Sequence, residues 1–183
     1  MRELSLHILD IVQNSISAAA SLISICIDED IEGDRLTIKI KDNGRGIPED
    51  ILLHITDPFY TTRKTREVGL GLALFAQTAR RCEGDLQVDS RIGEGTEVTA
   101  FFSFSHIDRP PMGDIKGTLL SLIALNPDLD FIYRHSYGGR EFVLDTGVIK
   151  RELQGIEINQ REVLGWLRGY IREGLEDLYG GEG

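Results

Sequence analysis

The chain has 183 residues, enough for one good core or for one domain with a smaller module, and its 41% apolar and 27% charged composition is typical of globular proteins. Its formal net charge of -10 argues against a nucleic-acid-binding surface, because neutralising phosphates needs clustered Lys and Arg. No apolar run approaches the ~20 residues of a membrane span, and residues 1–3 lack the features of a signal peptide. We therefore expect a cytoplasmic protein with no membrane span.

Residues 3–20 have the periodicity of a helix that is apolar over most of its circumference. A stripe of polar residues on the remaining side faces either water or a polar site, and the helix alone leaves both interpretations open. The residues of this stripe, spaced at three and four, are Glu3, His7, Asp10, Asn14 and Ser17.

Residues 22–28 and 36–41 alternate apolar and polar side chains, which is the pattern of half-buried strands. The second strand ends abruptly at Asp42-Asn43-Gly44-Arg45-Gly46-Ile47-Pro48, where two glycines permit a tight backbone path. There Asp42 can accept a hydrogen bond from an exocyclic amine, while the glycines leave room for a flat ring. Asp-Asn-Gly is also an ordinary turn sequence, so this stretch alone does not decide between a turn and a ligand site.

A basic, hydroxyl-rich segment at residues 59–67 follows a short helix that begins at Pro48 and ends before residue 57. The segment leads into Gly69-Leu70-Gly71-Leu72 at the start of another helix. Free backbone N–H groups and the positive end of the helix dipole bind anions at such a position, phosphates included. Gly-x-Gly is also typical of a flexible loop, so both interpretations stay open here as well.

Two further strands complete the predicted sheet of the N-terminal region. Residues 72–81 continue the helix, with Gly84 as its cap, and residues 85–90 and 97–104 are predicted strands joined by a glycine-bearing turn. This order of elements predicts one mixed sheet of four strands with helices on a single face. The fold class is therefore α/β, of the two-layer α+β sandwich type.

The composition changes at residues 107–113, which we interpret as a linker. We therefore predict two domains, residues 1–106 and a small C-terminal α+β module at residues 107–183. No catalytic constellation stands out in the module. Its predicted elements are helices at 114–125 and 148–154, a hairpin of 130–136 with 140–146, and a last helix that begins at an Asn159–Glu162 capping box.

Together, these motifs resemble the histidine-kinase-like (GHKL) ATPase superfamily, which includes histidine kinase ATP-binding domains, DNA gyrase B, ATP-dependent chaperones and mismatch-repair ATPases. The resemblance covers residues 3–104, looks closest to sensor histidine kinases and anti-sigma serine kinases, and implies a Bergerat-type ATP-binding fold. The matching stretches are Asp10-Ile11-Val12-Gln13-Asn14-Ser15 (N box), Asp42-Asn43-Gly44-Arg45-Gly46 (first glycine box), Asp57-Pro58-Phe59-Tyr60-Thr61-Thr62 (F box and lid), Gly69-Leu70-Gly71-Leu72 (second glycine box) and Gly93-Glu94-Gly95-Thr96-Glu97 (closure of the adenine pocket).

The resemblance also implies a role for individual residues. Asp42 would accept from the adenine amino group, with Gly46 and Thr96 completing the pocket. Asn14 would coordinate a Mg²⁺ ion that bridges the phosphates, since a neutral oxygen ligand suits a hard cation. The other ATP-binding residues implied are Gly44, Ile47, Phe59, Thr61, Thr62, Arg63, Lys64, Gly69, Leu70, Gly71 and Leu72. Which of Arg63, Lys64 and Arg66 reaches the phosphates stays open.

Asp10 occupies the catalytic position implied by the resemblance, one helical turn before Asn14. Many relatives have a glutamate there, which orients or deprotonates the attacking water. Aspartate is one methylene shorter, and a shift of ~1 Å can cost catalysis about a hundredfold. The resemblance therefore implies ATP binding and leaves efficient hydrolysis open.

We expect a stand-alone regulatory kinase or ATPase that binds Mg-ATP and acts on a separate partner protein. Only nine residues precede Asp10, and none of the four histidines lies in a His-Glu-x-x-x-Pro-like context, so autophosphorylation in the usual manner is not expected. The alternative is a catalytically silent module whose lid reports ATP or ADP to a partner. The identity of the partner and the oligomeric state, a homodimer included, stay open.

Overall fold

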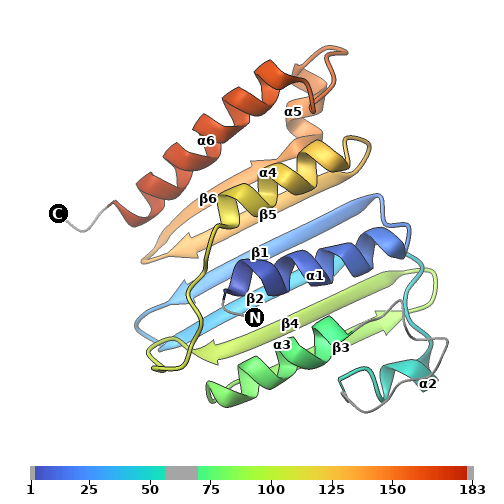
Figure 1. Ribbon diagram of the computed structural model, residues 1–183, viewed down its shortest axis with the longest axis vertical. Coiled ribbons are helices and arrows are strands. Elements are labelled where there is room, and N and C mark those ends of the chain that lie inside the picture. The colour runs from blue at the N-terminus through green and yellow to red at the C-terminus, as the bar shows by residue number, and fades with distance from the viewer. Residues whose placement is uncertain (1–2, 57–69, 181–183) are drawn as a thin grey trace.

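The structure is a computed structural model that describes residues 3–56 and 70–180 (Figure 1). The strands within these residues are β1 (Leu22–Asp30), β2 (Arg35–Asp42), β3 (Asp85–Arg91), β4 (Gly95–Ser103), β5 (Asp130–Tyr137) and β6 (Arg140–Asp145). They form one mixed sheet in the order β3-β4-β2-β1-β5-β6. The neighbours β1 and β5 run parallel, and the other neighbouring pairs are antiparallel.

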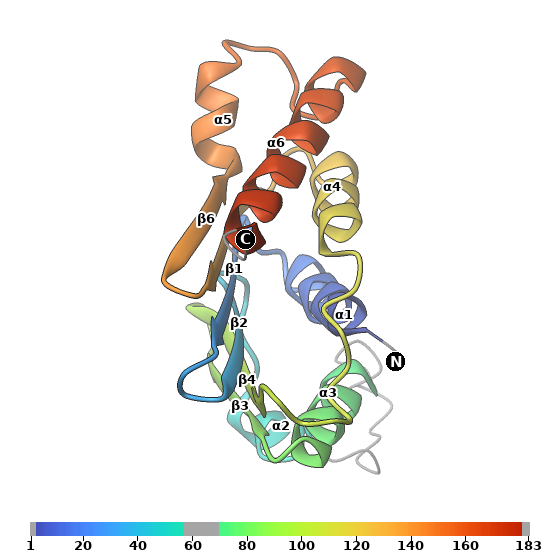
Figure 2. The same ribbon diagram turned by 90° about the vertical axis from the view of Figure 1, so that its left-hand side faces the viewer.

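The helices within the described residues are α1 (Leu4–Ser17), α2 (Glu49–Leu52), α3 (Leu70–Arg81), α4 (Ile115–Leu125), α5 (Thr146–Glu152) and α6 (Arg161–Tyr179). Most of them cover one face of the sheet (Figure 2). Figure 2 shows α1, α3, α4 and α6 together on one side of the strands. The side chains alternate accordingly, since Ile38 and Ile40 of β2 are buried while Lys41 is exposed. This arrangement confirms the predicted α/β sandwich of helices on a mixed sheet.

The C-terminal strands extend the sheet of the N-terminal region. β5 runs parallel to β1 along eight residue pairs, and β6 follows as the edge strand. Ile25 of β1 lies opposite Tyr133 of β5, and both side chains are buried in one apolar cluster. The predicted division into residues 1–106 and 107–183 stays a prediction about folding units, while the described strands form a continuous sheet across it.

The segment that leads into α4 also closes the start of α1. The Leu4 N–H donates to the Pro111 carbonyl and the Ser5 N–H donates to the Met112 carbonyl, both at 2.9 Å. These carbonyls satisfy N–H groups that the first turn of a helix cannot pair internally. Within the described part of the chain, no helix has the length and apolarity needed to cross a membrane.

Two predicted helix ends differ from the structure in detail. The sequence predicts Gly84 as the cap of α3; its N–H does donate to the Ala79 carbonyl at 2.9 Å, but the left-handed residue at this end is Glu83, with φ 56°. Gly84 also permits a close approach to β4, since a Cβ on it would lie 1.7 Å from the Phe101 carbonyl oxygen. At α6 the cap residue is Gln160, which makes no side-chain cap hydrogen bond, so the helix does not begin at the Asn159–Glu162 capping box.

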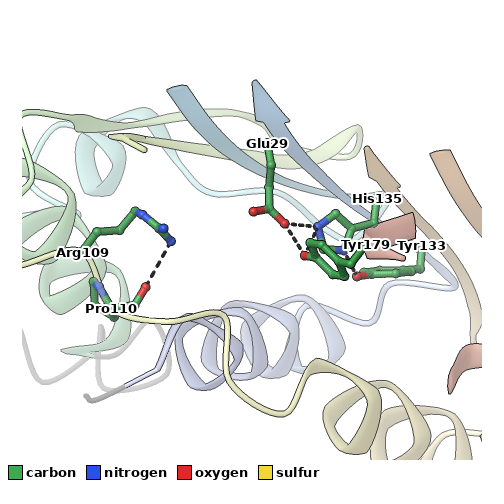
Figure 3. Close-up of polar contacts among 6 residues, drawn as sticks. All are labelled: Glu29, Arg109, Pro110, Tyr133, His135 and Tyr179. Atoms are coloured by element: carbon green, nitrogen blue, oxygen red, sulfur yellow. Dashed lines mark hydrogen bonds and ion pairs between the residues drawn. The ribbon is translucent and has the colours of Figure 1, made fainter. Parts of the chain in front are cut away.

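A buried polar network joins β1, β5 and α6 at one end of the sheet (Figure 3). His135 is 1% exposed, and its ring nitrogens lie 2.7 Å from the Tyr133 hydroxyl and 2.7 Å from Glu29 Oε1. The buried Tyr133 hydroxyl needs an acceptor, so it donates to Nδ1 and leaves Nε2 to donate to Glu29. The Tyr179 hydroxyl donates to the same Glu29 oxygen. The network thus holds the last turn of α6 on the sheet.

These donors also lower the pKa of Glu29. Burial alone would raise the pKa of this carboxyl, but hydrogen bonds from His135 and Tyr179 and the nearby Arg109 guanidinium outweigh burial, so the pKa lies below its usual range. The stability that this lowered pKa contributes is present above the pKa of an unfolded glutamate. It is lost as the pH falls through the lowered value of the folded state.

We predict that Tyr179→Phe lowers the free energy of unfolding at neutral pH by about 1–3 kcal/mol, because a buried carboxylate loses a donor. Tyr170→Phe on the same helix is the control, since it removes only a 3.5 Å hydrogen bond at an exposed position and should cost less than about 0.5 kcal/mol. Urea denaturation at neutral and acidic pH measures the free energy of unfolding of the parent and both variants. The loss in Tyr179→Phe should shrink in acid as Glu29 becomes protonated. Equal losses in the two variants would contradict the role of the network.

Candidate functional site

The carboxylate of Asp42, at the end of β2, is buried and ties three segments together. Asp42 is 6% exposed, and its Oδ2 accepts a hydrogen bond from the Ser15 hydroxyl of α1 at 2.5 Å. Oδ1 accepts from the backbone N–H of Gly44 at 2.9 Å and from that of Thr96 at 3.3 Å. A buried carboxylate is tolerated where such donors surround it. The end of α1, the loop after β2 and the start of β4 are therefore held around one side chain.

Glycines let the loop after Asp42 run directly against the turn between β3 and β4. A Cβ on Gly46, where φ is 74°, would lie 2.0 Å from the Arg91 carbonyl oxygen. A Cβ on Gly95, where φ is 112°, would lie 2.0 Å from the Asp42 carbonyl oxygen. Both positions need glycine for the backbone conformation and for the close approach.

α1 ends three residues before the end predicted from the sequence, and the residues that follow hold the same loop. The helix stops at Ser17, and Ala19 has a left-handed backbone with φ 58°. The Ala18 carbonyl accepts from the Arg45 N–H at 2.9 Å. The early end of the helix thus places a carbonyl beside the first glycine box.

Ser90 and Thr96 form a hydroxyl pair between β3 and β4. Their side-chain oxygens are 2.8 Å apart, and Ser90 Oγ also accepts from the Ile47 N–H at 2.8 Å and donates to the Gly95 carbonyl at 3.0 Å. No sequence motif marks Ser90, and Ser15 stands inside the N box without an assigned role. A serine within a strand or helix carries no signal of its own, so only the fold shows that both belong to this site.

Residues from α1, the glycine loop, β4 and the start of α3 line one cavity. Its polar end is formed by the Asp42 carboxylate and Thr96, while Ile11, Leu72 and Val98 contribute apolar wall. Six of the predicted binding residues line it together, namely Asn14, Asp42, Gly46, Ile47, Leu72 and Thr96. Gly44 contributes instead through its N–H, which is bonded to Asp42.

The first turn of α3 lies against the polar stripe of α1. A Cβ on Gly71 would be 3.1 Å from the Cβ of Asp10 and 3.2 Å from its Oδ2, so glycine permits the approach of helix and carboxylate. Burial raises the pKa of Asp10, against the opposing effect of the positive N-terminus. Leu72 faces the cavity, whereas Leu70 is 62% exposed.

His7 forms the contact between α1 and α3 one turn before Asp10. Its ring is buried, stacks on Phe75 with ring centroids 4.8 Å apart, and has Nε2 3.3 Å from Thr78 Oγ1. Burial, together with the positive N-terminus, lowers the pKa of His7 to about 4, so the ring is neutral at neutral pH. The stripe of His7, Asp10 and Asn14 therefore faces α3 and the cavity, which answers the question that the helix alone left open.

Several predicted site residues lie outside the described residues. They are Phe59, Thr61, Thr62, Arg63, Lys64 and Gly69. Their roles stay predictions, as does the role of Asn14 in binding Mg²⁺. Within residues 3–56 and 70–180, no three acidic, histidine or cysteine side chains gather in a way that could hold a metal ion. The prediction from the sequence is that Asn14 would hold a Mg²⁺ ion together with the nucleotide phosphates.

A family model described as "Histidine kinase-, DNA gyrase B-, and HSP90-like ATPase" matches residues 2–106. The chain belongs to this ATPase family. Members of the family bind ATP, typically with Mg²⁺. The matched residues contain α1, the Asp42 loop, α3 and the strands β1 to β4, so the family match coincides with the elements that line the cavity.

Curated relatives of this ATPase domain include kinases. Sensor histidine kinase RcsC of Escherichia coli is 25% identical over 167 residues, which cover 81% of this chain and 18% of the relative. Sporulation kinase E of Bacillus subtilis (strain 168) is 39% identical over 66 residues, covering 36% of this chain and 9% of the kinase. The chain thus spans less than a fifth of the length of these relatives.

A solved structure shares the fold of this ATPase family member over almost the whole length of the present chain. The crystal structure of the N-terminal domain of a DNA repair protein superposes with a TM-score of 0.56, covering 99% of this chain and 58% of the other, at 15% identity. At that identity the similarity concerns the fold alone. It extends beyond residue 106 and includes β5 and β6.

The cavity residues of this ATPase domain fit the nucleotide that the family binds. Apolar walls suit a purine ring, and a carboxylate at the polar end suits an amino group on the ring edge. The N–H groups in the first turn of α3 suit phosphates, and the amide oxygen of Asn14 suits Mg²⁺. Bound Mg-ATP would supply a transferable phosphoryl group whose charge the metal ion offsets.

We predict that Gly46→Ala lowers the free energy of unfolding by about 2–5 kcal/mol, because the added Cβ meets the Arg91 carbonyl in addition to the cost of the left-handed backbone. Gly93→Ala is a matched control, since its φ of 81° is similar but nothing lies within 4 Å of the added Cβ. It should cost only about 1–2 kcal/mol. Chemical denaturation of both variants measures the difference, and equal losses would show that close approach is not what requires Gly46.

Proposed function

We propose that this chain binds Mg-ATP in the cavity beside Asp42 and works as a regulatory kinase or ATPase on a separate protein. The observation that carries the proposal is the Asp42 carboxylate, which three protein donors hold at the polar end of a cavity that also has apolar walls from Ile11, Leu72 and Val98. Burying a carboxylate is unfavourable, so its presence here favours recognition of a donor on a ligand. The family of the chain and its similarity to sensor kinases support the same function.

A separate protein is the proposed acceptor of the phosphoryl group. His7 and His135 are buried, His7 against Phe75 and His135 between Tyr133 and Glu29. No histidine is among the described residues that line the cavity. Neither of these two buried histidines can reach a phosphate in the cavity without leaving the core. Transfer would then go to a side chain of the partner or to water, and Asp10 is the candidate that orients the attacking hydroxyl and takes its proton.

The second candidate function is a nucleotide sensor without chemistry, and Asp10 is the observation that favours it. Aspartate is one methylene shorter than the glutamate found at this position in many relatives, and here it lies against Gly71. Binding through Asp42 does not need this residue, so ATP could be bound and only sensed. Turnover that Asp10→Asn abolishes would count against the sensor, whereas binding without turnover or transfer would favour it.

We predict that the chain binds ATP and ADP in the presence of Mg²⁺, and that Asp42→Asn weakens binding about ten- to a hundredfold. The reason is the loss of a charged acceptor, together with the disturbance of the three donors that it holds. Isothermal titration calorimetry of the parent chain and the variant measures the effect.

Asp28→Asn is the matched control for this measurement, because Asp28 is exposed on β1 and does not line the cavity. Its affinity for ATP should equal that of the parent chain. No binding by the parent, or equal binding by the parent and Asp42→Asn, would contradict the proposed nucleotide site.

A further inference from the structure

We propose that Ser90 sets the hydrogen-bonding direction of the Thr96 hydroxyl, and that the cavity thereby selects a purine with an amino group, not a carbonyl oxygen, at its six position. The inference rests on the proposed function, because it concerns the specificity of the same ATP site. Ser90 is not among the residues that line the cavity, whereas Thr96 is. Ser90 is therefore a positioning residue that acts through Thr96.

The number of protons at Ser90 determines this direction. Ser90 Oγ carries one proton and has three polar neighbours: the Ile47 N–H at 2.8 Å, the Gly95 carbonyl at 3.0 Å and Thr96 Oγ1 at 2.8 Å. The N–H can only donate and the carbonyl can only accept. Ser90 therefore accepts from Ile47 and gives its proton to Gly95. The Thr96 hydroxyl has to donate to Ser90, and every group in the set is then paired.

A Thr96 hydroxyl that donates to Ser90 presents only lone pairs to the cavity. The neighbouring Asp42 carboxylate likewise offers only lone pairs. The polar end of the cavity thus combines two acceptors and suits a ligand edge that carries N–H donors. An amino group at the six position supplies such donors. A carbonyl oxygen in the same place would face acceptors and remain unpaired, and only the N1–H beside it could donate.

The sheet keeps Ser90 and Thr96 together. The two residues lie opposite each other in the antiparallel pair of β3 and β4, so their side chains project on the same face. Ser90 also anchors Ile47, which lines the cavity. Removing the Ser90 hydroxyl would thus have two separable effects. Loss of the Ile47 anchor would weaken all nucleotides alike, while release of the Thr96 proton would change their relative affinities.

The test is calorimetric titration of the full chain with ATP and with inosine triphosphate, which carries a carbonyl oxygen in place of the amino group, each with Mg²⁺. We expect the parent to prefer ATP, and the ratio of the two dissociation constants to fall about tenfold in Ser90→Ala, because Thr96 can then donate to the carbonyl. Ser90→Thr keeps the hydroxyl and should retain the parental ratio. Equal weakening of both nucleotides in Ser90→Ala, with the ratio unchanged, would overturn the proposal.

Thr96→Val provides a second route that does not depend on the behaviour of Ser90→Ala. Removing this acceptor should weaken ATP more than inosine triphosphate, and adding Ser90→Ala to Thr96→Val should leave the ratio unchanged, because the effect of Ser90 passes through Thr96. A ratio that still shifts in the double variant would overturn the proposal. A parent chain that binds neither nucleotide would contradict the proposed function itself, which distinguishes that failure from a failure of this inference.

Discussion

The hydrogen bonds to the Asp42 carboxylate are the constraint on which the cavity of this ATPase domain depends. One side chain at the end of β2 receives donors from α1, from its own glycine loop and from β4, through Ser15, Gly44 and Thr96. The loop in turn lies so close to the β3–β4 turn that Gly46 has no room for a side chain. The cavity therefore has a polar end whose geometry is set by these hydrogen bonds and close backbone contacts, which is how a site is pre-organised for a ligand.

α1 connects this end of the molecule with the C-terminal part. Its last turn supplies Ser15 and Asn14 to the cavity, and its first turn is closed by the carbonyls of Pro111 and Met112. At the other end of β1, the network of Glu29, His135 and Tyr179 holds α6 on the same sheet (Figure 3). The element that carries the predicted nucleotide-binding residues is thus packed on one continuous sheet and contacts the C-terminal part directly.

Local sequence patterns were sufficient for most elements and for the outline of the site. Alternation along β2 and the glycine motif after it predicted both the strand and the position of Asp42, because both signals lie within a few residues. The parallel pairing of β1 with β5 was beyond such patterns, since Ile25 and Tyr133 are brought together only by the tertiary fold. The contacts of Ser90 with Ile47 and Thr96 were likewise beyond local patterns, because only the fold brings these residues together. At the end of α3 the sequence predicted the cap at Gly84 but not that this glycine also permits close contact with β4, which a propensity argument does not include.

The most direct test of the account is backbone hydrogen exchange, followed by mass spectrometry, with and without saturating Mg-ATP. If the nucleotide binds beside Asp42, exchange should slow in residues 42–47, in the last turn of α1 and in the first turn of α3, because ATP stabilises the segments that these hydrogen bonds join. Exchange in peptides from α6, which does not line the cavity, should be unchanged. Slowed exchange confined to surfaces away from the cavity, or no change at all, would contradict the account.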